Sequence, residues 1–134
     1  MNPFRLHHIG VWVGNLEAMR EFYVTVLGGS SGPKYVNPQT DFQSYFISFL
    51  EDFSVELMSR PCASRIAAAA PGLGDAHIAL SVGYRAAVDE ALARLKGLGV
   101  KVVSEPRTTG DGYYEAVVED PEGNKIELVT EPDM

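Results

Sequence analysis

Two histidines and two glutamates stand at matching places in the two halves of this 134-residue chain. His8 opens the segment His-Ile-Gly-Val-Trp-Val-Gly, and His77 opens His-Ile-Ala-Leu-Ser-Val-Gly 69 positions later (77 minus 8). Glu56 lies within Val-Glu-Leu-Met, and Glu127 lies within Ile-Glu-Leu-Val 71 positions later (127 minus 56). Imidazole nitrogens and carboxylate oxygens are ligands for borderline divalent metals. The four side chains therefore predict a site for one such ion: Zn²⁺, Ni²⁺, Co²⁺, Mn²⁺ or Fe²⁺.

Each of the four residues also has a plainer interpretation. A single histidine in a strand is more often a hydrogen-bonded core or surface residue than a ligand, and a single glutamate in a terminal strand is usually solvated. A glutamate inside an apolar strand needs a partner, because desolvating a carboxylate is costly. The recurrence of both residue types in both halves favours the metal site. For the neighbouring His7 we expect a partly exposed side chain without a function.

The segments that carry these residues have the patterns of strands. Apolar side chains alternate with others over residues 8–13 and again over 77–82, which predicts two half-buried strands. The histidine falls on the face opposite the aliphatic residues in each. We expect further strands over residues 45–50, 54–59, 100–103, 113–119 and 125–130. Residues 34–37 are a weak candidate for one more strand in the first half. Turn residues at 51–53 and 120–124 predict hairpins.

A helix pattern follows the first strand of each half. Asn15 is a good N-cap, apolar residues recur after it at helical spacing, and Gly28 stands where a helix ends. In the second half apolar residues recur at the same spacing from Val88 to Leu95, and Gly97 or Gly99 ends the helix. Each half is therefore a βαβββ module. If the helices cover the aliphatic faces of the strands, the four polar residues point to the concave side.

Composition sets further expectations. The formal net charge of −7 disfavours general attraction to nucleic acid or anionic lipid, although a local arginine cluster would still accept an anionic substrate. Cys62 is the only cysteine, so no intrachain disulfide forms, which fits a reducing compartment. No apolar run reaches the length of a signal peptide or a membrane span. We expect a cytoplasmic protein without nucleic-acid or membrane partners.

The chain resembles the vicinal oxygen chelate superfamily, which includes glyoxalase I, methylmalonyl-CoA epimerase, extradiol dioxygenases and the bleomycin and fosfomycin resistance proteins. The resemblance covers nearly the whole chain. Its motifs are residues 8–13, Glu21-Phe22-Tyr23 before Leu27-Gly28, residues 77–82, and the Asp-Pro-Glu-Gly-Asn hairpin at 120–124 that leads into Lys125-Ile126-Glu127-Leu128. It implies a single α+β domain in which modules at approximately 4–60 and 75–131, joined by a linker at 61–74, form an open eight-stranded barrel. It also implies a homodimer, and the sequence leaves open whether the site lies within one chain or across two.

The ligand order His, Glu, His, Glu is that of glyoxalase I. The resemblance implies a metal-dependent lyase or isomerase that acts on a small substrate with vicinal oxygens through an enediolate. Glu127 is the first choice for the catalytic base, with Glu56 or a metal-bound hydroxide as alternatives. Trp12 stands where bacterial glyoxalase I tends to carry an arginine, and Arg60 replaces an expected asparagine. The resemblance therefore implies the metal site but does not imply that the protein recognises glutathione.

Candidate substrate contacts come from apolar, basic and tyrosine side chains near the predicted ligands: Trp12, Phe49, Met58, Arg60, Arg107 and Tyr113. The aromatic residues have an alternative role as plain core, and the arginines as partners of surface acids. The polar, glycine-rich segment 107–114 is either a flexible loop or a lid over the substrate.

Two other functions use the same scaffold. A sequestering resistance protein would bind a small molecule without turnover, but it would not need the complete ligand set. An acyl-CoA epimerase usually carries glutamine where this chain has Glu56, and it needs a basic phosphate cradle that the sequence does not show.

Overall fold

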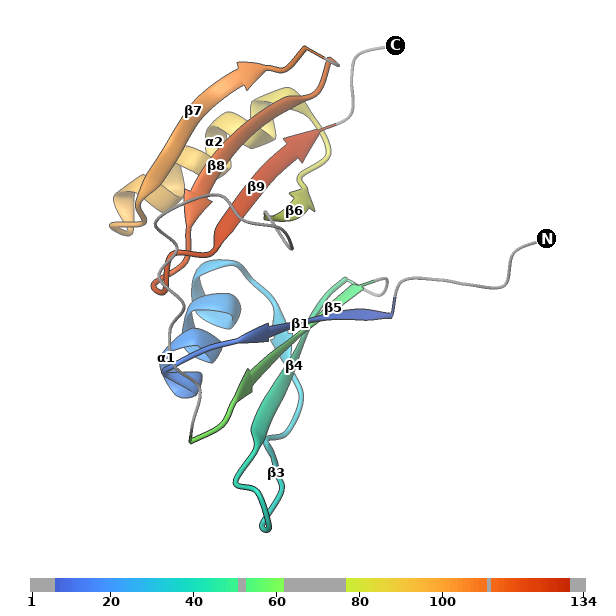
Figure 1. Ribbon diagram of the computed structural model, residues 1–134. Coiled ribbons are helices and arrows are strands. Elements are labelled where there is room, and N and C mark those ends of the chain that lie inside the picture. The colour runs from blue at the N-terminus through green and yellow to red at the C-terminus, as the bar shows by residue number, and fades with distance from the viewer. Residues whose placement is uncertain (1–6, 51–52, 62–76, 111, 131–134) are drawn as a thin grey trace, which may run out of the picture. The chain divides into compact units, whose positions relative to one another are not determined.

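The computed structural model describes residues 7–50, 53–61, 77–110 and 112–130 (Figure 1). The chain divides into two compact units, Met1–Ala67 (unit 1) and Ala68–Met134 (unit 2), and each is described by itself. Three predicted features lie outside the described residues: Cys62, most of the linker at 61–74, and the first two residues of the turn at 51–53.

Unit 1 is a sheet with a helix on one face. The sheet order is β1-β5-β4-β2, with β3 also paired to β4, and β1 runs parallel to β5 (Figure 1). Helix α1 and the π-helical turn η1 follow β1, and α1 packs on β4 and β5. The elements are β1 (His8–Trp12), α1 (Leu16–Glu21), η1 (Phe22–Val26), β2 (Ser30–Ser31), β3 (Tyr35–Val36), β4 (Gln43–Phe49) and β5 (Phe53–Ser59).

Unit 2 repeats this arrangement. The sheet order is β6-β9-β8-β7, β6 runs parallel to β9, and α2 packs on β7, β8 and β9 (Figure 1). The elements are β6 (Ile78–Ser81), α2 (Arg85–Gly97), β7 (Val102–Thr108), β8 (Tyr114–Glu119) and β9 (Lys125–Thr130). In both units the first strand pairs with the last, so the repeat in the sequence is also a repeat in the topology.

Backbone geometry confirms the predicted N-cap of the first helix and the glycines predicted to end both helices, whereas the second helix begins at Arg85, three residues before its apolar pattern. The Asn15 side chain accepts a hydrogen bond from the Ala18 amide at 3.1 Å, which caps the first helix. Gly28 and Gly99 have φ of 81° and 82°, the left-handed conformation that ends a helix without strain only at glycine. A glycine in the left-handed conformation therefore follows the helix in both units, and the two glycines are 71 positions apart (99 minus 28).

The core of each unit lies between its sheet and its helix. Val55 and Leu57 on β5, and Ile126 and Leu128 on β9, are buried against the helix. Each such side chain contributes roughly 1.5–3 kcal/mol through the hydrophobic effect. Because side chains alternate along a strand, residues 56 and 127 point to the other side. We call this side, opposite the helix, the open face of each sheet.

Two strand predictions need correction. The strand predicted at 100–103 is β7, and it extends through Arg107 and Thr108, which we had placed in a loop. Polar composition indicated the loop, but pairing of Arg107 with Glu115 on β8 keeps the backbone extended across two register shifts. The short strand β2 was missed, because two residues carry no periodicity.

The fold class is α+β, with sheets of five and four strands in the described part of the chain. Within the described residues, no helix is long and apolar enough to cross a membrane.

Candidate metal centre and its surroundings

The first histidine and glutamate meet on the open face of unit 1. His8 Nε2 lies 3.5 Å from Glu56 Oε1, and the side chains are 35% and 16% exposed. Strand β1 pairs with β5 so that Gly10 lies opposite Glu56. His8 is two residues before Gly10, so its side chain is on the same face of the sheet as the Glu56 carboxylate. Parallel pairing of the first and last strands is therefore what joins residues 48 positions apart (56 minus 8).

Unit 2 builds the same pair by the same register. His77 Nε2 lies 3.1 Å from Glu127 Oε2, and the side chains are 42% and 16% exposed. Ala79 stands opposite Glu127, as Gly10 stands opposite Glu56. The two carboxylates thus have the same exposure, and each faces an imidazole that is partly open to solvent.

The geometry of each pair fits a shared divalent ion. Two ligand atoms about 2.1 Å from one ion lie about 3.0 Å apart at a right angle and about 3.4 Å apart at a tetrahedral angle. The observed separations of 3.5 Å and 3.1 Å fall close to these values, and the nitrogen–oxygen donor set suits the same metals. Among the described residues no three or more candidate ligands gather at one point.

His7 makes an unexpected contact with the first ligand. Its Nδ1 lies 2.7 Å from Nδ1 of His8, with the two rings edge to face. His8 is therefore held at both ring nitrogens, by His7 on one side and by Glu56 on the other. A partner on the second nitrogen is a common means of orienting a ligating histidine.

Glu115 on β8 is a site residue that sequence reasoning missed. It is a diagonal neighbour of Glu127 on the open face, because Glu115 pairs with Val129 and Val117 pairs with Glu127. Burial raises the pKa of the Glu127 carboxyl, and a hydrogen bond with Glu115 raises this pKa further against the opposing effect of His77. The alternation of side chains along β8 could have predicted this, because it places Glu115 on the same face of the sheet as Glu127.

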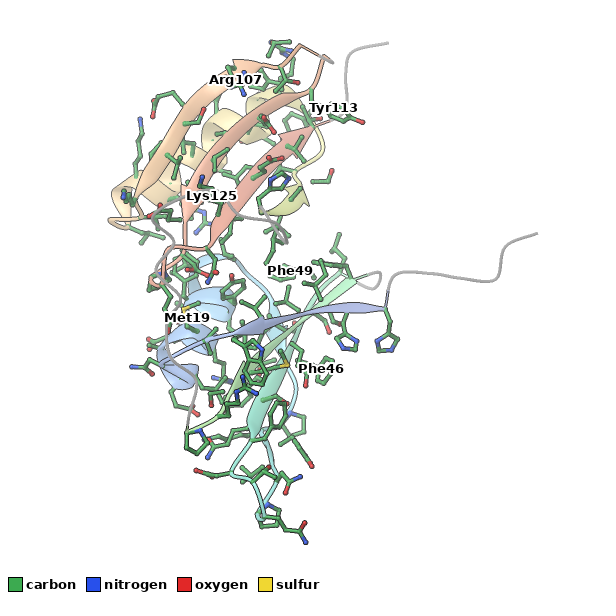
Figure 2. All side chains as sticks on the ribbon, in the orientation of Figure 1. Met19, Phe46, Phe49, Arg107, Tyr113 and Lys125 are labelled. Carbon is green, nitrogen blue, oxygen red and sulfur yellow. The ribbon has the colours of Figure 1, made fainter. Side chains whose placement is uncertain are left out.

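Arg107 continues this row of charges. Its Nη2 lies 3.8 Å from Oε1 of Glu115, whose side chain is 12% exposed. Figure 2 shows Arg107 and Tyr113 near one end of the sheet of unit 2. The Tyr113 carbonyl accepts a hydrogen bond from the Thr109 amide at 2.8 Å and so closes the turn before β8.

Around the pair of unit 1 the side chains are aromatic instead. The Phe46 ring lies 5.0 Å from the His8 ring, edge to face. Trp12, at the other end of β1, is 46% exposed and carries the Arg60 guanidinium 4.2 Å above its ring. Met58 lies against Gly10, where a methyl group would come within 2.8 Å of its Cε. Trp12, Met58 and Arg60 thus lie together beside Glu56.

Phe49 does not belong to this group. It shares the helix face of β4 with Tyr45 and Ile47, and its ring approaches Gly29 at the end of η1. Figure 2 shows Phe46 and Phe49 at separate places in unit 1. The structure therefore does not bring Phe49 together with Trp12, Met58 and Arg60, and its contact with a substrate stays a prediction.

A model of the Glyoxalase/Bleomycin resistance protein/Dioxygenase superfamily matches residues 5–128. The chain belongs to this superfamily. The predicted family is thereby confirmed, and the repeated His–Glu pairs lie within the matched region. Because the match extends from before His8 to beyond Glu127, it includes every candidate ligand.

Relatives of this superfamily member include enzymes named for one activity. The lactoylglutathione lyase of Escherichia coli O157:H7 is 32% identical over 133 residues, which cover 96% of this chain and 94% of the relative. The lactoylglutathione lyase of Salmonella typhimurium is 31% identical over 130 residues with the same coverage. These relatives support a function of the glyoxalase family.

Solved structures agree with the fold. Glyoxalase I from Zea mays is 25% identical with a TM-score of 0.77; the match covers 97% of this chain and 46% of the maize chain. This chain thus spans about half the length of the maize enzyme. A glyoxalase family protein from Enterococcus faecalis is 22% identical with a TM-score of 0.80, covering 94% of this chain and 97% of that one. The second likeness shows the fold alone.

Proposed function

We propose that this protein is a metal-dependent lyase or isomerase of the glyoxalase I type, acting on a small substrate with vicinal oxygens. One observation carries the proposal: each unit holds a histidine and a glutamate within 3.5 Å of each other at equivalent register positions. The relatives named lactoylglutathione lyase support the reaction class. Packing alone would preserve apolar positions after a duplication, but not two matched polar pairs on the open faces.

The residues that would hold one divalent ion are His8, Glu56, His77 and Glu127. Such an ion, when bound, supplies Lewis-acid stabilisation to two neighbouring oxygens of a substrate. In this proposal the two modules form one domain with an open eight-stranded barrel, and the protein is a cytoplasmic homodimer. The two pairs then meet either within one chain or between two chains.

A mixing experiment separates these arrangements. One variant lacks the first pair (His8→Ala with Glu56→Ala), and the other lacks the second (His77→Ala with Glu127→Ala). If the site joins two chains, refolding the variants together restores metal binding that neither shows alone. If the site lies within one chain, the mixture stays as deficient as its components.

Glu127 is the proposed base. It takes the proton from the carbon that bears the substrate hydroxyl; the C–H electron pair forms the carbon–carbon double bond of an enediolate, and the π pair of the neighbouring carbonyl moves onto its oxygen. Glu127 then returns the proton to the former carbonyl carbon, while the hydroxyl of the first carbon gives its proton to the other oxygen and becomes a carbonyl, so atoms and charge balance. Burial and the hydrogen bond with Glu115 raise the pKa of the Glu127 carboxyl. A raised pKa makes the carboxylate a stronger base for taking the proton from carbon. Glu56 is the second candidate for the same role.

Conservative substitutions test this assignment. We expect Glu127→Gln to lower turnover of a 2-oxoaldehyde–thiol adduct by at least about 100-fold, the scale of general base catalysis. Metal content, measured by plasma mass spectrometry, should fall less than turnover. Glu105→Gln is the control, because Glu105 is an exposed acid of the same unit that pairs with Lys96. Unchanged metal content and turnover in Glu127→Gln would remove Glu127 from the mechanism.

A ligand-binding protein on the same fold is the second candidate function. The exposed aromatic side chains beside His8 favour it, since they form a binding surface that needs no chemistry. Metal analysis of the purified, reconstituted protein decides between the two. Less than about one tenth of an equivalent would favour binding without turnover.

A further inference from the structure

Unit 1 exposes a row of aromatic rings on one side of its sheet. Trp12 and Phe42 meet edge to face with centroids 6.0 Å apart, and Tyr35 lies 6.1 Å from Phe42. Trp12 is 46% exposed and Tyr35 is 52% exposed. We call these three rings, together with Phe46, the aromatic surface. An exposed apolar patch of this kind marks a binding site more often than chance placement.

The aromatic surface shares its face with the His8–Glu56 pair. His8, Gly10 and Trp12 alternate onto the open face of β1, so the indole is four positions along the strand from the ligand. At about 3.3 Å per residue, this spacing is about 13 Å. Met58 lies over Gly10 and fills the interval with an apolar thioether. A bound molecule would therefore run along an apolar path from His8 to Trp12.

Arg60 adds a positive charge at the far end of this path. Its guanidinium lies 4.2 Å above the Trp12 ring, and no carboxylate of the described residues pairs with it. Stacking on an aromatic ring holds the guanidinium in plane and leaves its N–H groups free for a planar anion. In a chain with a net charge of −7, an arginine that pairs with no acid in the described part of the chain is suited to a ligand.

Unit 2 lacks this set of residues. By register, Ser81 stands where Trp12 does, Val129 where Met58 does, and Val117 where Phe46 does. The two units keep the same histidine and glutamate but not the same surroundings. The aromatic surface is therefore not needed to build the sheet or the His–Glu pair, which leaves recognition as its role.

We infer that Trp12 and Arg60 select a small substrate that carries a carboxylate next to an aromatic or other flat apolar group. In this arrangement the carboxylate forms two parallel hydrogen bonds with Arg60, the apolar group lies on Trp12, and the vicinal oxygens reach the His8–Glu56 pair about 13 Å away. Only the placement of the oxygens rests on the proposed function. The binding of the carboxylate by Arg60 and of the apolar group by Trp12 is inferred from the contacts within unit 1.

Trp12 is the only tryptophan of the chain, so its fluorescence reports on this site directly. The probes are 4-phenylbutyrate, the uncharged 4-phenylbutyramide, and butyrate, which lacks the ring. They are titrated into the full-length protein, with and without reconstituted metal. We expect 4-phenylbutyrate to change the emission and to bind at least about tenfold more tightly than either analogue, a difference of about 1.4 kcal/mol.

Arg60→Gln should abolish the preference for the acid over the amide and leave amide binding within about twofold. Arg85→Gln is the matched control, because Arg85 stacks on the Tyr114 ring at 4.0 Å in unit 2. In Trp12→Leu, calorimetry should show weaker binding of both ring-bearing probes, with an unchanged circular dichroism spectrum as the test of folding.

Three results would overturn the inference. They are equal binding of acid and amide to the wild type, full preference retained in Arg60→Gln, and Trp12 emission that acrylamide does not quench. The last result would mean that protein covers the aromatic surface. A protein that passes these tests but binds no metal would refute the proposed function and leave the recognition site in place.

Discussion

The open faces of the two units differ around an identical pair of side chains. In unit 1 the His8–Glu56 pair is flanked by Phe46 and Met58, which are apolar. In unit 2 the His77–Glu127 pair is flanked by Glu115, which contacts Arg107. The repeated residues are those of the proposed metal site, and their surroundings are what the two halves do not share.

The helix faces show a different kind of repetition. In unit 1 the Tyr45 hydroxyl donates to Glu17 of α1 at 2.9 Å, and in unit 2 the Tyr114 hydroxyl donates to Asp89 of α2 at 2.7 Å. By register, however, the counterpart of Tyr45 is Ala116. The same link between sheet and helix is therefore built from different positions, as expected for a stabilising contact. The His–Glu pairs, in contrast, occupy equivalent register positions, as the proposed shared metal site requires.

The largest predicted effect tests the equivalence of the pairs. We expect His8→Ala and His77→Ala each to weaken binding of the preferred divalent ion by at least about 100-fold, because each removes one of four ligands. Competition with a chelator of known affinity gives the dissociation constants. If one variant keeps the affinity of the wild type, the two units do not contribute alike.

A second prediction tests the difference between the open faces. Glu115→Ala should weaken metal binding about tenfold, the usual effect of removing a partner of a ligating carboxylate. The counterpart of Glu115 in unit 1 is Ser44, which lies opposite Met58 as Glu115 lies opposite Val129. Ser44→Ala should change the metal affinity less than about twofold. Equal losses in both variants would contradict the distinct role of Glu115.

Much of this architecture could be predicted from the sequence. Alternation of side chains placed His8 and Glu56 on strands, and the internal repeat linked them to His77 and Glu127. Glu115 could not be predicted from the repeat, because its counterpart in the first half is Ser44. The face on which Phe49 lies could not be predicted, because the register of β4 depends on its pairing with β5, which composition does not reveal.

A third prediction concerns packing after the two helices. Gly29 follows Gly28 in unit 1, and Val100 follows Gly99 in unit 2. A methyl group on Gly29 would lie 2.5 Å from Ile47 Cγ2 and 3.1 Å from the Tyr23 carbonyl oxygen. Gly29→Ala should therefore lower the free energy of unfolding by about 1–3 kcal/mol, measured by urea denaturation. Unchanged stability would show that unit 1 accommodates a side chain here as unit 2 does.

The smallest predicted effect concerns the helix-face link of unit 1. Hydrogen bonds from Lys34 and Tyr45 lower the pKa of Glu17 from its usual 4.5. Because the folded-state pKa is lowered, this stabilisation is present above about pH 4.5 and is lost as the pH falls through the folded value. Tyr45→Phe should cost about 1 kcal/mol at pH 7, and less at pH 3. A cost that does not vary between these pH values would contradict the role of the Glu17 carboxylate.

The metal content of purified protein tests the central claim most directly. If both His–Glu pairs hold one ion together, the reconstituted wild type binds about one equivalent per chain, and each variant without one pair binds less than about one tenth. Plasma mass spectrometry with protein quantified by amino-acid analysis gives this ratio. Two equivalents in the wild type, or about one equivalent in each variant, would show that the pairs act separately and would contradict a shared site.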